Sequence, residues 1–279
     1  MHVEVIIGHT PRARIICDAM ATGIRRCGDS VRESKEEFYN GPVGDVAVFY
    51  GLSGKLRDAF LAYRQAGLKA VYIDLGYWNR TEGGKLYGYH KIAVNSRHPT
   101  AYYSQRYHAK DRFAKLGVNI KPWNKGGTHI LLAGMGAKAA DVEGFKANEW
   151  EEAAVRELRR YTDRPIIYRP KPSWRGPIAI EGTLFSPAEQ PLAEVLDNCH
   201  ATVSHHSNVC VDGLLEGIPS FCFHGVATDM GHSNLSLIES PIYPDGRDMW
   251  AAHVAYTQWK PDEMQGGHAW HYLKDEGLV

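Results

Sequence analysis

Short apolar runs alternate with amphipathic stretches along the first half of the chain. Apolar runs typical of buried parallel strands lie at residues 3–7, 45–50, 69–73 and 90–95. Thr10 followed by Pro11 is typical of a helix start and predicts a helix that continues to about Arg26. Apolar residues at helical spacing predict a second helix over residues 53–66. Strands that alternate with helices in this order predict βαβ units and a parallel sheet.

A polar stretch with two glycines, residues 121–127, interrupts this pattern, which then begins again. The strands predicted beyond it span residues 128–133, 165–169, 201–204 and 218–223. The helices predicted beyond it span residues 149–161, 187–198 and 207–216. The tail, residues 249–274, is predicted to be largely helical, with a helix start at Pro261 in its middle.

These patterns predict an α/β protein with two doubly wound, Rossmann-like domains that face a cleft. The linker at 121–127 divides the chain into a first domain of residues 1–125, a second of residues 126–248 and a C-terminal segment of residues 249–279. In open α/β sheets ligands bind beyond the carboxyl ends of the strands, so two facing sheets can share one ligand. The functional residues are therefore expected in the loops that follow the strands.

Composition narrows the function classes. The 279 residues carry a formal net charge of zero, whereas a protein that binds nucleic acid mainly by neutralising phosphates is usually basic. Residues 105–112 form a short basic strip, for which a solvated helix face is the preferred interpretation. The apolar runs are too short to span a bilayer and the start lacks the pattern of a signal peptide. The five cysteines are odd in number and have no Cys-x-x-Cys pair, which favours reduced thiols in the cytoplasm.

Residues 202–221 carry the strongest chemical signal. A strand is followed by His205 and His206, and then Ser207 and Asn208 open a helix. The free N–H groups and the partial positive charge of a helix N-terminus suit a phosphate, although Ser207 and Asn208 are also ordinary helix caps. Two acidic residues further along the helix are placed to reach a ribose: Asp212 and Glu216.

Two further loops in the second half suit an anion. Arg169 and Lys171 follow a strand and alternate with prolines, a rigid arrangement of cations that suits a diphosphate or, alternatively, a solvated surface loop. Gly134 and Gly136 follow another strand, where backbone N–H groups can approach an anion and Lys138 supplies charge. Three anion-suited loops in one domain predict a nucleotide-diphosphate site.

The first half offers different groups after its strands. Asp74 and His9 are the candidate general bases for an acceptor hydroxyl, and an aspartate at this place is also a common turn former. Tyr50, Tyr77 and Trp78 are the candidate acceptor-binding residues. The chain has neither an H-E-x-x-H sequence nor a carboxylate-rich D-x-D loop, so no required protein-bound metal is expected.

The strand-turn-helix at 203–223 resembles the donor-binding segment of GT-B-fold glycosyltransferases. The Arg-Pro-Lys-Pro loop at 169–172 is similar to loops in the capsule and sialic-acid branch of that fold. Gln258, Trp259, Glu263 and Trp270 resemble the terminal helix of the fold, which implies that residues 249–279 pack back on the first domain. The combination of Asp74-Leu-Gly-Tyr-Trp, Tyr168-Arg-Pro-Lys-Pro-Ser-Trp and Gln258-Trp259 resembles small bacteriophage proteins of this fold, some of which glycosylate hydroxymethylated pyrimidines in DNA.

The resemblance implies a metal-independent glycosyl transfer from a nucleotide-sugar, a UDP-sugar above all, with no other cofactor. The acceptor that it implies is a hydroxymethylated base in double-stranded phage DNA, and the location is the cytoplasm, that of the host if a phage encodes the protein. Two alternatives stay open. A sugar-nucleotide 2-epimerase would use a similar donor site without an acceptor, and a non-catalytic protein would bind a nucleotide-sugar or nucleic acid without turnover.

Overall fold

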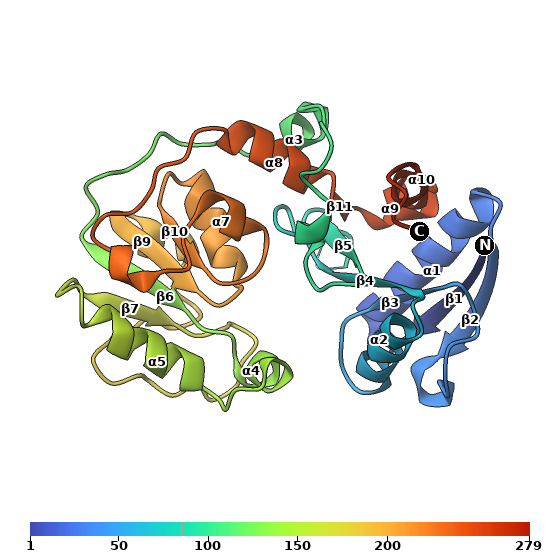
Figure 1. The fold of residues 1–279 in the computed structure, drawn as a ribbon, viewed down its shortest axis with the longest axis horizontal. Helices are drawn as coiled ribbons and strands as arrows, with labels where there is room; N and C mark the ends of the chain where they lie inside the picture. The colour runs from blue at the N-terminus through green and yellow to red at the C-terminus, as the bar shows by residue number, and fades with distance from the viewer. Residues whose placement is uncertain (85) are drawn as a thin grey trace. The chain divides into compact units, whose positions relative to one another are not determined.

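A computed structural model gives the fold of residues 1–84 and 86–279 (Figure 1). The chain divides into two compact units. Unit 1 comprises residues 1–116 and 252–279, and unit 2 comprises residues 117–251. The last part of the chain therefore belongs to the same unit as the first. No helix in the described part of the chain has both the length and the apolar character that a membrane span requires.

Unit 1 is built on a six-stranded sheet with the order β11-β5-β4-β3-β1-β2. Its strands are β1 (His2–Ile7), β2 (Ser30–Lys35), β3 (Val46–Tyr50), β4 (Lys69–Leu75), β5 (His90–Val94) and β11 (Gln258–Trp259). Strands β2, β1, β3 and β4 run parallel, whereas β5 pairs antiparallel with β4 and with β11. Strand β1 lies between β2 and β3, so the strand order reverses between β1 and β3.

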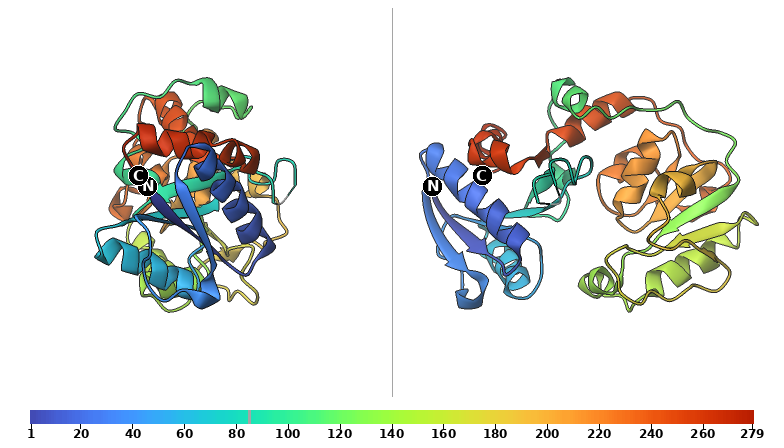
Figure 2. Two further views of the ribbon diagram at one scale, coloured as in Figure 1. Left: turned by 90° about the vertical axis from the view of Figure 1, so that its right-hand side faces the viewer. Right: turned by 180° about the vertical axis from the view of Figure 1, so that it is seen from behind.

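Helices cover both faces of the unit 1 sheet. The helices of this unit are α1 (Pro11–Arg26), α2 (Lys55–Gln65), α3 (Asp111–Lys115), α9 (Pro261–Gln265) and α10 (His268–Asp275). Helices α1, α9 and α10 share one apolar core with β1, β3 and β4, and α2 packs on the opposite face through Leu56, Phe60 and Tyr63. Figure 2 shows α1 beside the C-terminal helices when the molecule is seen from behind. Helix α1 begins where the sequence predicts, because the Thr10 side chain accepts a hydrogen bond from Ala13 N at 3.1 Å.

Helix α1 approaches α9 closely at Gly23. A Cβ added at this residue would lie 1.9 Å from the Met264 carbonyl oxygen, which is backbone and has little room to move. Gly23→Ala is therefore expected to destabilise unit 1 by about 1–3 kcal/mol, as overpacking does. This is opposite in sign to the gain of about 1 kcal/mol that replacing glycine by alanine normally gives inside a helix. Urea unfolding checks the prediction, with Asp18→Ala at an exposed position of α1 as the control. A stabilised Gly23→Ala protein would contradict the close packing.

Unit 2 is built on a five-stranded parallel sheet with the order β10-β9-β6-β7-β8. Its strands are β6 (His129–Ala133), β7 (Ile166–Arg169), β8 (Leu184–Phe185), β9 (Cys199–Ser204) and β10 (Ser220–Cys222). The first strand, β6, lies in the middle, with β7 on one side and β9 on the other. The strand order therefore reverses between β6 and β9, which in open α/β sheets is where ligands bind.

The helices of unit 2 also lie on two faces of its sheet. They are α4 (Ala137–Glu143), α5 (Glu149–Leu158), α6 (Leu192–Leu196) and α7 (Asn208–Leu215), and α8 (Arg247–Ala255) follows them. Helices α4 and α5 share a core with Ile130, Leu132 and Val203, whereas α6 and α7 contribute to a second core around Leu131 and Ile218. Helix α4 follows β6 and packs on one face of the sheet, whereas helix α7 follows the neighbouring strand β9 and packs on the opposite face.

Two local expectations were wrong, and two strands were not predicted. The strand at 90–95 runs antiparallel, because the chain returns from β4 without a helical crossover. The sequence analysis missed β2, a polar edge strand with exposed positions. The helix expected at 187–198 shortens to α6, since the preceding residues bind the Arg169 side chain. The tail is largely helical and α9 begins at Pro261, as predicted, but the short strand β11 between α8 and α9 was missed; it pairs with β5.

Candidate functional site

The reversal point of the unit 2 sheet is flanked by two of the predicted anion-binding loops. The loop after β6 contains Gly134 and Gly136, and the loop after β9 contains His205, His206 and Ser207. The sequence assigned both loops to strand ends, and the parallel pairing of β6 with β9 now shows that the two strands are neighbours. The structure therefore brings these two parts of the predicted donor site to one edge.

Backbone conformation and close packing favour glycine at the two positions after β6. Gly136 has a φ of 79°, a left-handed conformation that favours glycine, and it precedes α4. A Cβ at Gly134 would lie 2.9 Å from the Tyr168 hydroxyl, and one at Gly136 would lie 3.4 Å from the Lys171 Cβ. Lys171 is exposed, and its side chain lies beside Gly136 of this loop. The side chain predicted for the same site at Lys138 lies outside the described part of the structure.

A buried glutamate holds the glycine loop by a hydrogen bond to its backbone. Glu151 of α5 is 1% exposed, and its Oε1 accepts a hydrogen bond from Met135 N at 2.7 Å. Burial raises the pKa of Glu151. Within the part of the chain that the structure describes, its Oε2 is buried and has no hydrogen-bond partner. Sequence analysis missed this residue because it stands among several glutamates of one helix, and only the fold distinguishes it from the solvated ones.

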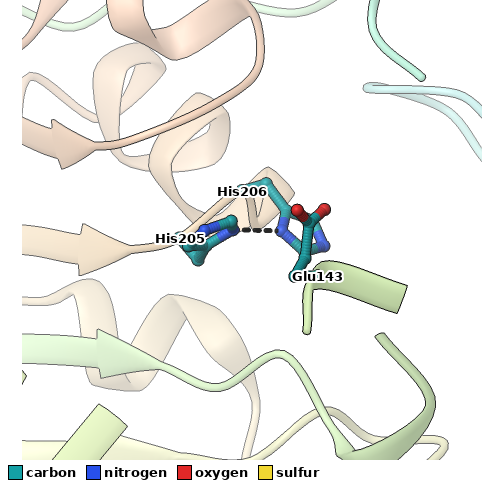
Figure 3. A group of neighbouring side chains, drawn as sticks. All are labelled: Glu143, His205 and His206. Carbon is teal, nitrogen blue, oxygen red and sulfur yellow. Dashed lines mark hydrogen bonds between the residues drawn. The ribbon is translucent and has the colours of Figure 1, made fainter. Parts of the chain in front are cut away.

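Ser207 is the N-cap residue of α7. Its Oγ accepts a hydrogen bond from Val209 N at 3.2 Å, and its own N–H donates to Ser204 Oγ at 3.0 Å. His205 is buried and His206 is half-buried, and their Nδ1 atoms lie 2.8 Å apart. The two side chains face each other at the start of the helix (Figure 3).

The other predicted donor residues on α7 lie further along the helix. Asn208 and Asp212 are half-buried, and Glu216 is the C-cap residue. Because a helix rises 1.5 Å per residue, Glu216 is roughly 13 Å along the axis from Ser207. Its carboxylate forms an ion pair with Lys121. Glu216 therefore lies at the far end of the helix from the predicted phosphate position.

Arg169 has structural contacts that the sequence did not indicate. Its Nη1 donates to Ser186 Oγ at 3.0 Å and to the Pro187 carbonyl at 3.2 Å, and its Nη2 donates to the Gln190 carbonyl at 2.7 Å. The side chain is 7% exposed. These bonds hold the segment before α6 against the end of β7, so Arg169 positions a loop at this edge of the sheet.

The end of β1, beside the reversal point of the unit 1 sheet, presents a histidine–carboxylate pair. His9 follows β1, and its Nε2 lies 2.7 Å from Oε1 of Glu36, which follows β2. Its Nδ1 lies 3.7 Å from a carboxylate oxygen of Glu37. The His9 side chain is 66% exposed, whereas that of Glu36 is 12% exposed. A buried carboxylate that orients an exposed imidazole is an arrangement suited to general base catalysis.

Tyr50, a predicted acceptor-binding residue, lies at the same reversal point with two residues that sequence analysis missed. Arg12 Nη1 donates to the Tyr50 hydroxyl at 3.5 Å, and the His90 ring packs edge-on against the tyrosine at 5.7 Å. Burial and the nearby Asp74 raise the pKa of Tyr50 to about 12. Burial, with Arg12 next, lowers the pKa of His90 to about 4, so this imidazole is neutral at pH 7.

The remaining predicted residues of unit 1 differ in exposure. Asp74 is half-buried, and its carboxylate accepts hydrogen bonds from the Tyr72 hydroxyl at 2.7 Å and from Leu75 N at 2.8 Å. Tyr77 and Trp78, the other two candidate acceptor-binding residues, are only 1% and 4% exposed. Their backbone N–H groups donate to Oε1 of the buried Gln258, because β11 closes over this loop.

Comparisons with solved structures agree with this fold. The chain is similar to the β-Kdo 2,4-transferase part of KpsC from Thermosulfurimonas dismutans, with 13% identity, a TM-score of 0.55 and 92% of each chain covered. It is also similar to the β-Kdo 2,7-transferase part of KpsC from the same organism, with 11% identity and a TM-score of 0.51, over 98% of this chain and 100% of that one. No family model and no curated protein sequence matches the chain. The protein is therefore an α/β protein with two Rossmann-like units and the GT-B glycosyltransferase fold.

Proposed function

We propose that this protein is a glycosyltransferase that moves a sugar from a nucleotide-sugar donor to an acceptor hydroxyl. The observation that carries the proposal is the reversal point of the unit 2 sheet. There a glycine loop, an exposed lysine and the N-terminus of α7 come from three separate segments of the chain. Each of these features suits a phosphate, and the reversal point is where open α/β sheets bind nucleotides. The fold shared with two sugar transferases supports the same conclusion.

The donor phosphates would bind between the glycine loop and α7. Backbone N–H groups beside Gly136 and Ser207 would donate hydrogen bonds, and Lys171 would supply positive charge. Arg169 would hold the neighbouring loop in place, since its guanidinium already bonds Ser186 and Gln190. Fixed donors aimed at the leaving phosphate stabilise the transition state, so the proposed transfer requires no metal ion. Half-buried Asp212 is the residue of α7 that we propose for the ribose.

The acceptor hydroxyl would lose its proton to His9. Glu36 would orient the imidazole and stabilise its protonated form, as carboxylates do in histidine-based catalytic pairs. Asp74 is the second candidate base, and hydrogen bonds from the Tyr72 hydroxyl and Leu75 N hold its carboxylate at the end of β4. Tyr50 lies at the same strand ends and is the residue of unit 1 that we propose for acceptor contact.

A thermal-shift screen tests the donor site first. The purified protein would be heated with UDP, GDP, CMP, ADP and their common sugar conjugates, including those of Kdo. A nucleotide at about 100 times its Kd stabilises the folded protein by about 2.7 kcal/mol. We expect Lys171→Ala to reduce the shift and Lys146→Ala, an exposed lysine of the same unit, to leave it unchanged. No shift with any nucleotide would overturn the proposal.

A hydroxymethylated pyrimidine in phage DNA is the acceptor that we propose to try first. Its support is the sequence resemblance alone. Two arginines of the basic strip at 105–112 already form ion pairs with acidic residues of the same unit. Arg106 pairs with Glu276 at 3.4 Å, and Arg112 pairs with Glu263 at 2.7 Å. Transfer of labelled sugar to hydroxymethylated DNA, and none to unmodified DNA, would support this acceptor. Isomerisation of the donor without any acceptor would instead favour an epimerase.

A further inference from the structure

Two histidines and a glutamate meet beside the glycine loop of unit 2. His205 and His206 follow β9, and Glu143 is the last residue of α4, which begins after that loop. One ligand atom from each residue lies within 4.8 Å of the others. Figure 3 shows the three side chains together, with a dashed line joining the His205 and His206 rings and the Glu143 carboxylate drawn at His206. Imidazole nitrogens and carboxylate oxygens are the ligands that Zn²⁺ takes in catalytic sites.

The spacing of the two histidines is close to that of two ligands on one ion. Their Nδ1 atoms lie 2.8 Å apart. With metal–nitrogen bonds of about 2.0–2.1 Å, two nitrogens are separated by roughly 2.9 Å at a right angle and roughly 3.3 Å in a tetrahedron. A movement of a few tenths of an ångström would therefore admit an ion between them. A ligand atom of Glu143 lies within 4.8 Å of both histidine nitrogens.

The surroundings hold His205 in place. Its ring packs edge-on against Phe145 and Trp150, at 5.7 Å and 5.6 Å, and is 5% exposed. Its carbonyl accepts hydrogen bonds from Phe223 N at 3.1 Å and His224 N at 2.8 Å. An imidazole that is fixed before binding loses little freedom when it ligates an ion, which favours affinity.

Glu143 has an electrostatic reason to bind a cation. The carbonyl end of a helix carries partial negative charge, which disfavours a carboxylate there by about 0.3–1 kcal/mol. Glu143 ends α4, and the last turn of this helix contains no basic residue. A divalent ion held by Glu143 and the histidines would reverse this unfavourable interaction.

We propose that Glu143, His205 and His206 bind a divalent transition-metal ion, with Zn²⁺ as the best fit. Three protein ligands leave a coordination position open for water or for a phosphate oxygen of a ligand at the α7 N-terminus. The site goes beyond the proposed transfer, which does not require an ion. Sequence analysis missed it because Glu143 is far from the histidine pair along the chain.

Metal titration of the whole protein tests this site. Protein stripped with a chelator and dialysed would compete for Zn²⁺ with a chromophoric chelator, and Co²⁺ would report the coordination geometry by its visible spectrum. We expect one tight ion per chain. Glu143→Gln and His206→Gln should each weaken binding by about 100-fold or more, beyond the effect of losing an outer hydrogen-bond partner. Both residues are half-buried, and circular dichroism would confirm that the variants fold.

His271→Gln is the matched control. His271 is 72% exposed and lies 3.4 Å from Asp275, so it is a histidine–carboxylate pair in the other unit. The control should keep the affinity of the original protein. Equal Zn²⁺ affinity in all four proteins, or no binding tighter than millimolar, would overturn the proposal. The nucleotide screen on metal-free protein is a separate readout, so failure of the metal site and failure of the donor site are distinguishable.

Discussion

Replacing His9 with alanine is expected to lower kcat of the proposed transfer by about 10²–10⁴-fold, the usual contribution of a general base. The thermal shift caused by the donor should stay unchanged, because His9 belongs to unit 1 and the loops proposed for the donor belong to unit 2. The physical reason is the pair that His9 forms with Glu36, whose mostly buried carboxylate lies 2.7 Å from Nε2. Initial rates with the donor and acceptor identified by screening are the measurement.

Two further variants separate His9 from the rival base. Glu36→Gln should reduce kcat less than His9→Ala does, because an amide still orients the imidazole but stabilises its protonated form poorly. Asp74→Asn tests the second candidate, and His2→Ala, an exposed histidine on β1, is the control. If Asp74→Asn abolishes turnover while His9→Ala leaves it intact, the base is Asp74 and the His9–Glu36 pair is structural.

The elements that the sequence predicted well are those whose local signals agree with their burial. Helix α1 has a threonine cap, a proline at its first position and an apolar face that packs on the sheet. Strands β1, β3, β6 and β9 are buried along nearly their whole length, so their apolar runs are continuous. Local pattern and tertiary packing indicate the same structure in these segments.

The elements and residues that it missed depend on distant parts of the chain. Strand β2 is polar because it forms an edge, and β11 exists because two residues pair with β5. The partner of His9 is Glu36, which arrives through the pairing of β2 with β1. The two loops proposed for the donor were recognised because a strand end followed by glycine or by a helix cap is a local signal. Glu151, which binds the backbone of the glycine loop, and Glu143 have no such signal.

Replacing Trp270 with alanine is expected to lower the free energy of unfolding of unit 1 by about 3–5 kcal/mol, the usual cost of removing a buried aromatic ring. Trp270 of α10 is fully buried in the core that it shares with α1 and α9. Its Nε1 also donates to Asp29 Oδ2 at 2.9 Å. Burial alone raises the pKa of Asp29, but hydrogen bonds from the N-terminal ammonium, Trp270 and Lys274 outweigh it and lower the pKa to about 2. The Asp29 side chain thus joins the C-terminal helix α10 to the N-terminus of the chain.

Urea unfolding followed separately for the two units would measure this effect. Trp270→Phe keeps most of the ring but removes the bond to Asp29, whose remaining partners are cations, so we expect a loss of about 1–3 kcal/mol. Tyr161→Ala, at an aromatic residue of unit 2 that is 38% exposed, should change stability by at most about 0.5 kcal/mol. A loss below 1 kcal/mol in Trp270→Ala would mean that the C-terminal segment folds apart from unit 1. The large loss would show that the last residues of the chain complete the core on which the His9 strand is built, so truncating them would remove the proposed base along with the fold.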